Sequence, residues 1–280
     1  MSELAAPRKP QAGRDLPVAF AVGLGLVLLV VASLFIRKEA FAVLAVVAVG
    51  AALWELAQAF TRRSIHLPLL PLLVGSVGIL VSAYTAGPEA LFVAFLLTVG
   101  GAVVWRVLDG SGLPALRDAT AAVFAAAYIP FLAGFAMLML AAPDGPVRVL
   151  LFILLAVASD TGGYAVGTLL GRHPMAPSVS PKKSWEGFAG SLVLACVVGV
   201  VGVQWWLHGR PLVGAFLGIA VVTTATLGDL AESMLKRDLE LKDMGRLLPG
   251  HGGILDRLDS MLISAPAVYL ILAVLQPVAS

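Results

Sequence analysis

The residues with the clearest capacity for chemistry lie between positions 229 and 260, just before the last apolar stretch of the chain. A glycine-rich run, PGHGG at 249–253, precedes a predicted helix start near Leu255. Backbone N–H groups at such a start bind anions, and the helix dipole favours them. Asp256 and Asp259, in the first turn of that helix, would repel a phosphate unless a hard cation lay between the anions. Mg²⁺ suits this arrangement, because it binds one or two carboxylates and leaves its other positions to phosphate and water.

The first half of this segment has the spacing of a helix that continues out of an apolar stretch. Its polar face is formed by positions i, i+4, i+7 and i+11, which are Asp229, Ser233, Lys236 and Glu240. We predict that Asp229 and Asp256 bind the metal from two opposite helices. The remaining phosphate charge would be neutralised by Lys236, Arg237, Lys242 and Arg257. Each residue alone would fit a solvated loop or a helix cap equally well, and the combination with GHGG is what favours a site.

A second polar segment follows another apolar run, which Asp160 interrupts near its middle. An ionised aspartate at the centre of a lipid-facing helix costs about 2.5–3.5 kcal/mol, so we predict that Asp160 faces a polar cavity, with helix packing as the alternative. Downstream, two cations and two hydroxyls fall within five residues, at Ser180, Lys182, Lys183 and Ser184. They suit the phosphates of a nucleotide, and a basic patch against anionic lipid is the alternative. Glu186 is predicted to bind a base or to pair with Lys183.

Glu55 is a weaker candidate inside the second apolar run, about 10 Å deep by helical rise. It would line the same cavity or pair with an arginine. The P-loop sequence GxxxxGK[ST] does not occur. The single cysteine, Cys196, excludes a CxxC metal site and a disulfide within the chain, and nothing indicates nucleic-acid binding.

The composition places these residues in a membrane protein. Of the 280 residues, 59% are hydrophobic and 13% are charged, and the mean hydropathy is +0.95, whereas a soluble domain has roughly 25% charged residues. We therefore predict an all-α, polytopic integral membrane protein. The net charge of +2 indicates no partner. Residues 1–15 are polar and rich in proline and alanine, and we predict that they form a disordered cytoplasmic tail.

Runs of about 20 apolar residues predict transmembrane helices. Nine such runs are present, at Leu16–Ile36, Ala40–Phe60, Leu67–Ala86, Pro88–Trp105, Ala119–Ala142, Val149–Gly171, Gly187–Leu207, Pro211–Gly228 and Leu258–Pro277. We group 16–145 as N-terminal transmembrane helices and 146–280 as a catalytic transmembrane domain. The two polar segments of that domain, 172–186 and 229–257, are predicted to lie on the same side.

The distribution of Lys and Arg predicts the orientation. With nine spans, most of the 19 basic residues fall on the side of the N-terminus, and the exceptions are Arg37, Lys38, Arg148 and Arg210. The positive-inside rule then places the N-terminus and both polar segments in the cytoplasm. We predict a multi-pass protein of the inner or plasma membrane, with an active site that faces the cytoplasm.

The run SMLKRDLELKDMGRLLPGHGGILDRLDS, residues 233–260, resembles the signature of the phosphatidate cytidylyltransferases, also called CDP-diacylglycerol synthases. The matching positions are Ser233, Lys236, Arg237, Lys242, Asp243, Gly245, Pro249, His251, Gly252, Gly253, Asp256, Arg257 and Asp259. The run SDTGGYAVGTLLGRHPMAPSVSPKKSWEGFAG is similar to another segment of that family. One soft departure is Ser184, where threonine is expected about as often. The resemblance is firm over residues 150–262.

The resemblance implies that CTP and phosphatidate react to give CDP-diacylglycerol and pyrophosphate. It implies a polytopic homodimer with a Mg²⁺-dependent site at the cytoplasmic face, where Asp229 and Asp256 bind metal and K⁺ is a candidate second cation. The expected catalytic residues are Asp229, Asp256, Lys236, Arg237 and Asp259. The expected substrate-binding residues are Asp160, Ser180, Lys182, Lys183, Ser184, Glu186, Ser233, Lys242, Asp243, His251, Gly252, Gly253 and Arg257. The expected partners are the two substrates and the lipid bilayer.

Three other functions stay open on the residues alone. A related CTP-dependent lipid enzyme, such as a prenyl-lipid cytidylyltransferase or a polyprenol or phytol kinase, would share much of the site. A secondary transporter would also place an aspartate at mid-membrane, but it predicts an inverted repeat, and the sequence has no convincing one. A structural scaffold would not explain paired carboxylates beside GHGG.

Overall fold

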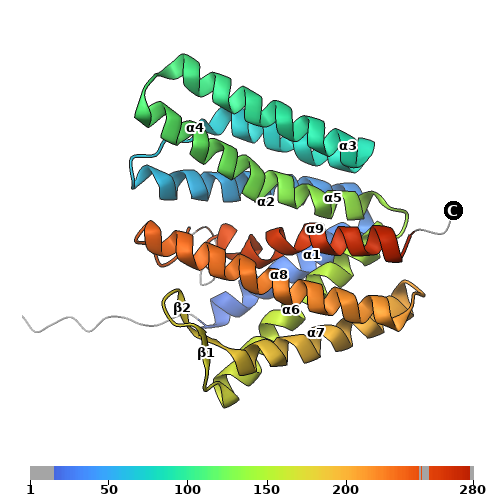
Figure 1. Cartoon of the computed structure of the whole chain (residues 1–280). Helices are drawn as coiled ribbons and strands as arrows, with labels where there is room; N and C mark the ends of the chain where they lie inside the picture. The colour runs from blue at the N-terminus through green and yellow to red at the C-terminus, as the bar shows by residue number, and fades with distance from the viewer. Residues whose placement is uncertain (1–15, 246, 248–251, 278–280) are drawn as a thin grey trace, which may run out of the picture.

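The structure, a computed structural model, describes residues 16–245, 247 and 252–277, with side chains from residue 21 onward. Helices dominate the described chain (Figure 1). The N-terminal half contains α1 (Leu16–Ile36), α2 (Lys38–Thr61), α3 (Leu69–Asp109), α4 (Leu113–Ala126), the π-helix η1 (Ala127–Phe131) and α5 (Leu132–Ala141). The C-terminal half contains α6 (Gly145–Leu170), the strands β1 (Pro174–Ala176) and β2 (Ser180–Ser184), α7 (Trp185–Trp206), α8 (Pro211–Asp238) and α9 (Leu255–Leu275).

Seven helical stretches of the described chain are long and apolar enough to cross a membrane. They are Lys38–Thr61, Leu69–Asp109, Leu113–Ala141, Gly145–Leu170, Trp185–Trp206, Pro211–Asp238 and Leu255–Leu275. The predicted class, an all-α polytopic membrane protein, is confirmed. A shorter apolar stretch of α1, Ala21–Ile36, precedes them. The number of nine spans and the orientation of the N-terminus stay predictions.

Helix α3 is bent back on itself at Gly87. At about 1.5 Å per residue its 41 residues would measure about 60 Å, twice the roughly 30 Å of a hydrocarbon core. Gly87 has φ 87° and ψ −170°, a conformation open to glycine, and Pro88 follows it. Gly75 lies against Thr98, where a Cβ would overlap with the threonine side chain, so the two halves pack as a hairpin. The break falls between the third and fourth predicted spans.

The predicted span Ala119–Ala142 is built from three consecutive helices, α4, η1 and α5. Pro130 has no backbone N–H and cannot continue a regular hydrogen-bond ladder, and it lies inside the five-residue π-helix η1. Tyr128, in the same turn, is buried. The proline therefore changes the local helical form, and the helical stretch continues on both sides of it.

The C-terminal half is a tight bundle in which glycines let helix backbones approach closely. Gly162 of α6 lies against the backbone of Gly190 in α7, and Gly199 of α7 lies against Gly214 of α8. A Cβ at any of these positions would overlap with the facing backbone or side chain. Small residues at such contacts are typical of helix packing inside membranes. These contacts pack α6, α7 and α8 closely together next to the polar segments.

Both polar segments lie at one end of the bundle. Figure 1 shows the β1–β2 hairpin, the C-terminal end of α8 and the start of α9 together at that end, on the left of the view. The Arg237 guanidinium on α8 donates to the Ser178 carbonyl between the two strands. Arg148 lies at the opposite end, where it donates to the carbonyl of Gln276 at 2.9 Å. The described residues of the two segments therefore meet at one end of the bundle, and the side of the membrane that they face stays a prediction.

Candidate active site

A cavity of about 280 Å³ lies where α6, α7 and α8 meet the β1–β2 hairpin. Asp160 contributes to its wall from α6, Lys182, Lys183 and Ser184 from β2, and Asp229 from α8. The prediction that Asp160 faces a polar cavity is thus confirmed. Because cations and carboxylates from three elements, α6, β2 and α8, line one space, a ligand with several phosphate groups and a counter-cation would fit its charge.

An ion pair closes one side of this cavity. The Lys183 ammonium contacts the carboxylate of Asp229, with 25% and 40% of the two side chains exposed. The alternative prediction, that Lys183 pairs with Glu186, is wrong. Glu186 instead contacts the His173 ring at 2.5 Å and accepts the backbone N–H of Arg172 at 3.1 Å. The chain turns back between β1 and α7, and this brings His173 to the helix start.

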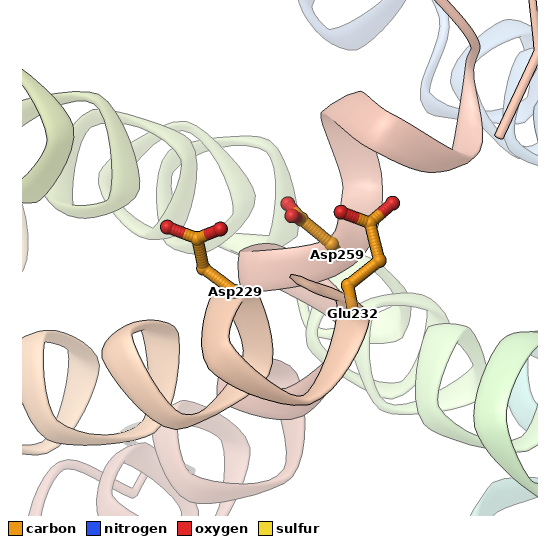
Figure 2. Close-up of side chains that lie close together, drawn as sticks. All are labelled: Asp229, Glu232 and Asp259. Carbon is orange, nitrogen blue, oxygen red and sulfur yellow. The ribbon is translucent and has the colours of Figure 1, made fainter. Parts of the chain in front are cut away.

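Three carboxylates converge between α8 and α9. Asp229, Glu232 and Asp259 each offer an oxygen, and these oxygens lie within 4.8 Å of one another. Figure 2 shows Asp229 and Glu232 projecting from one helix, α8, and Asp259 reaching toward them from α9. Glu232 is 1% exposed and Asp259 is 8% exposed. Residues 229 and 232 are three apart on a helix, so they share a face.

In the part of the chain that the structure describes, two of these three carboxylates form ion pairs with lysines. Lys236 contacts Oε2 of Glu232, and Lys183 contacts Asp229. Among the described residues, Oε1 of Glu232 has no hydrogen-bond donor. A buried carboxylate without a donor is costly, and a hard cation with oxygen ligands would stabilise it. The donor set therefore fits Mg²⁺, with coordination positions left for phosphate and water.

Asp256 has a different environment from Asp229. Its carboxylate accepts the N–H groups of Met244 at 3.0 Å and Gly253 at 2.9 Å, and it contacts the Lys236 ammonium at 3.1 Å. Lys236 thus joins Asp256 to Glu232. The residues that share a potential metal position with Asp229 are Glu232 and Asp259, so the predicted Asp229–Asp256 pair stays a prediction.

The other predicted residues are distributed around these two features. Ser184 caps α7 by accepting the Gly187 N–H at 3.1 Å. Half-buried or partly exposed positions at the same end are Ser180, Ser233 and Gly252, and exposed ones are Lys182, Arg237, Lys242, Asp243 and Arg257. His251, a predicted substrate-binding residue, lies outside the described residues.

One residue near the site was missed from the sequence, and another has a different environment from the predicted one. Glu232 was missed, although it lies three residues after Asp229 on the same helix. This i+3 spacing places the two side chains on one face and could have identified Glu232 from the sequence. Glu55 was expected to line the cavity or to pair with an arginine. Within the described chain it does neither, and its Oε2 accepts the Leu255 N–H at 2.9 Å.

Comparison with known proteins bears on the whole chain. The model of the cytidylyltransferase family matches residues 18–275. A phosphatidate cytidylyltransferase of Mycobacterium leprae is 42% identical over 281 aligned residues, covering 95% of this chain and 90% of the relative. One of Mycobacterium bovis is 38% identical, with the same coverage of 95% and 90%. One of Haemophilus influenzae is 40% identical over 49% of this chain and 51% of its own length. Because the match extends over almost the whole chain, the chain belongs to the cytidylyltransferase family.

Proposed function

We propose that this protein transfers the cytidylyl group of CTP to phosphatidate, giving CDP-diacylglycerol and pyrophosphate for phospholipid biosynthesis. The observation that carries the proposal is the identity of 38–42% with phosphatidate cytidylyltransferases over 95% of the chain. The cavity supports it independently, because lysines and carboxylates from three elements surround a space that suits a polyphosphate. The bundle end supports it as well, because there a water-soluble nucleotide could meet the headgroup of a lipid whose chains stay in the bilayer.

The reaction needs positioning and charge neutralisation more than covalent help from the protein. An oxygen of the lipid phosphate attacks the α-phosphorus of CTP. A new P–O bond forms on that phosphorus as its bond to the β-phosphate bridging oxygen breaks, and pyrophosphate leaves. A phosphate monoester is a competent nucleophile at neutral pH, so the mechanism requires no strong general base.

The charged side chains have separate tasks in this mechanism. Lys182 and Lys183 on β2 face the cavity and would neutralise the triphosphate. Lys236, held between Glu232 and Asp256, would lie between the carboxylates and the attacking or leaving phosphate. Arg237 joins the hairpin to α8 and so keeps the lysines over the helix end.

We propose that the enzyme depends on Mg²⁺. Asp229, Glu232 and Asp259 have the oxygen donors to hold the ion, and Asp256 is the further candidate from the sequence. Bound there, Mg²⁺ would draw negative charge away from the phosphates, and K⁺ is a candidate second cation. Asp229 belongs to both proposed ligand sets, so its role does not depend on which set is correct.

The orientation and assembly belong to the same proposal. The basic residues clustered at the end with the cavity support a cytoplasmic site in the inner or plasma membrane, with the N-terminus inside. The family resemblance supports a homodimer. The related-kinase and transporter functions are less favoured, because the long relatives are named as phosphatidate cytidylyltransferases.

The test is product formation by detergent-purified protein given CTP and Mg²⁺, with and without phosphatidate. We expect pyrophosphate to be released only when CTP and phosphatidate are both present. Asp256→Asn should lose most of this activity, while Asp109→Asn, at the exposed end of α3, should keep it. CDP formation with a polyprenol acceptor, in place of pyrophosphate, would show that the protein is a lipid kinase and overturn the proposal.

A further inference from the structure

Glu55 is a buried carboxylate of the N-terminal half that reaches the C-terminal half. It lies on α2 and is 1% exposed. Its Oε2 accepts the backbone N–H of Leu255, a residue 200 positions later in the chain, at 2.9 Å. A buried carboxylate is costly to maintain, so its retention in a membrane helix calls for a specific role.

The partner of Glu55 is the first residue of α9. The N-cap position of that helix is Ile254, whose side chain has no atom that accepts a hydrogen bond. The first N–H groups of a helix have no partner inside it and carry its positive dipole end. Glu55, on α2, therefore caps α9, and this contact fixes the position of the start of α9.

Two glycines that precede α9, Gly245 and Gly253, pack against the same carboxylate. A Cβ on Gly245 or on Gly253 would overlap with the carboxylate of Glu55. The backbone N–H groups of Leu247 and Ile254 also lie near it. The backbone of these described residues thus surrounds one side chain of α2.

Both of these glycines contact two carboxylates, Glu55 and Asp256. Gly253 donates its N–H to Asp256 at 2.9 Å, and Gly245 donates to the same carboxylate at 3.5 Å. Both glycines are in contact range of Glu55 as well. Any shift of Gly245 and Gly253 away from Glu55 would therefore move donors that orient Asp256, and Asp259 lies three residues further along α9.

We propose that Glu55 is a positioning residue for the transfer reaction: it holds Gly245, Gly253 and the start of α9 in place, and thereby orients Asp256 and Asp259. This inference rests on the proposed function, but the contact it describes exists without substrate. It also assigns a task to the N-terminal helices, which contribute one carboxylate to the architecture of a site built from α6 to α9.

The test compares Glu55→Ala, Glu55→Gln and wild-type protein by steady-state kinetics and by hydrogen–deuterium exchange without ligands. Glutamine keeps an oxygen that can accept the Leu255 N–H, whereas alanine removes it. We expect Glu55→Ala to lower kcat about 10–100-fold with a smaller change in KM for CTP, as residues that orient a site typically do. Exchange should rise at the Gly253 and Leu255 amides, and Glu55→Gln should restore part of both properties.

Two control variants separate positioning from general stability. Asp118→Asn removes a carboxylate that is 1% exposed and pairs with Arg106 at 2.7 Å, so it should lower thermal stability without raising exchange at residues 252–258. Glu39→Gln changes a carboxylate at the other end of α2 that contacts the Tyr84 hydroxyl at 3.1 Å, and it should leave kcat unchanged.

Unchanged exchange at Gly253 and Leu255 in Glu55→Ala would overturn the proposal. So would a loss of kcat that Asp118→Asn reproduces at equal thermal stability. If wild-type protein releases no pyrophosphate with phosphatidate, the proposed function fails, while the exchange comparison still decides whether Glu55 holds Gly253 and the start of α9 in place.

Discussion

At the scale of single residues, the site is defined by which charges contact each other. Lys183 contacts Asp229, and Lys236 contacts both Glu232 and Asp256. In the proposed mechanism each lysine has two tasks: it compensates a carboxylate of the protein, and it would present positive charge to a phosphate. Removing the charge of one lysine would therefore affect the carboxylate that it contacts as well as the bound phosphate. These two effects would appear in different kinetic parameters.

Glu232→Gln tests the carboxylate group that the structure brings together. The change keeps the side-chain volume and removes one negative charge from the potential metal position. We expect the Mg²⁺ concentration for half-maximal pyrophosphate release to rise about tenfold, equivalent to about 1.4 kcal/mol of binding free energy. Glu89→Gln, at an exposed position of α3, is the matched control. An unaltered Mg²⁺ dependence would remove Glu232 from the ligand set and favour the Asp229–Asp256 pair.

Lys183→Gln tests the proposed contact between the hairpin and the nucleotide. Loss of one positive charge in a cavity should raise KM for CTP about tenfold, because a charge-assisted hydrogen bond contributes on the order of 1.5–3 kcal/mol. KM for phosphatidate should change less. Lys38→Gln, near the opposite end of the bundle, serves as the control. Equal rises in both KM values would contradict the assignment of Lys183 to the nucleotide.

At the scale of elements, two backbone features decide where the helices go. The break at Gly87 turns α3 into a hairpin, and the glycines of the C-terminal half let α6, α7 and α8 pack closely. The β1–β2 hairpin then projects from the junction of α6 and α7 and carries its lysines over the end of α8. Element geometry thus brings cations of one polar segment to the carboxylates of the other.

Gly87→Ala tests the turn in α3. An alanine at φ 87° and ψ −170° is strained, and we expect a loss of stability of about 1–3 kcal/mol. Thermal unfolding of the detergent-solubilised protein would measure it. Gly100→Ala is the control, because a Cβ there meets open space within α3. If both substitutions had the same effect on the melting temperature, the turn would not depend on the glycine conformation.

At the scale of the whole molecule, one end of the bundle gathers the cavity, the carboxylate group and the glycines that precede α9. Arg63 of the N-terminal half pairs with Glu240, just after α8, at 2.8 Å, and Glu55 caps α9. The two halves therefore contact each other at the site end by charged groups. A substitution in the N-terminal half can alter the site without touching substrate.

The orientation in the membrane can be measured by thiol labelling. In a Cys196→Ser background, Arg210→Cys and Lys242→Cys each provide one cysteine at an exposed position. We expect a membrane-impermeant maleimide to label Arg210→Cys in intact cells, and Lys242→Cys only after the membrane is permeabilised. The reverse pattern would place the site outside and contradict the positive-inside assignment.

Local sequence determined much of this protein. The hydrophobic runs predicted the membrane class, because burial of backbone polar groups in lipid leaves helices as the available form for such runs. The placement of Asp160 in a polar cavity followed from the cost of a charge in lipid. The run from Ser233 to Ser260 indicated the family, because it matches the family's signature at positions spread over its whole length.

Tertiary structure decided which of these charges meet. Lys183 pairs with Asp229 and leaves Glu186 to His173, a choice between two plausible partners that depends on how the hairpin folds over α8. Glu232 joins Asp229 and Asp259 because α8 and α9 pack side by side. Glu55 meets Leu255 across 200 residues of chain. Spacing along the chain identifies residues that are neighbours on one helix. Contacts between helices depend instead on packing angles and distances, which a short segment does not determine.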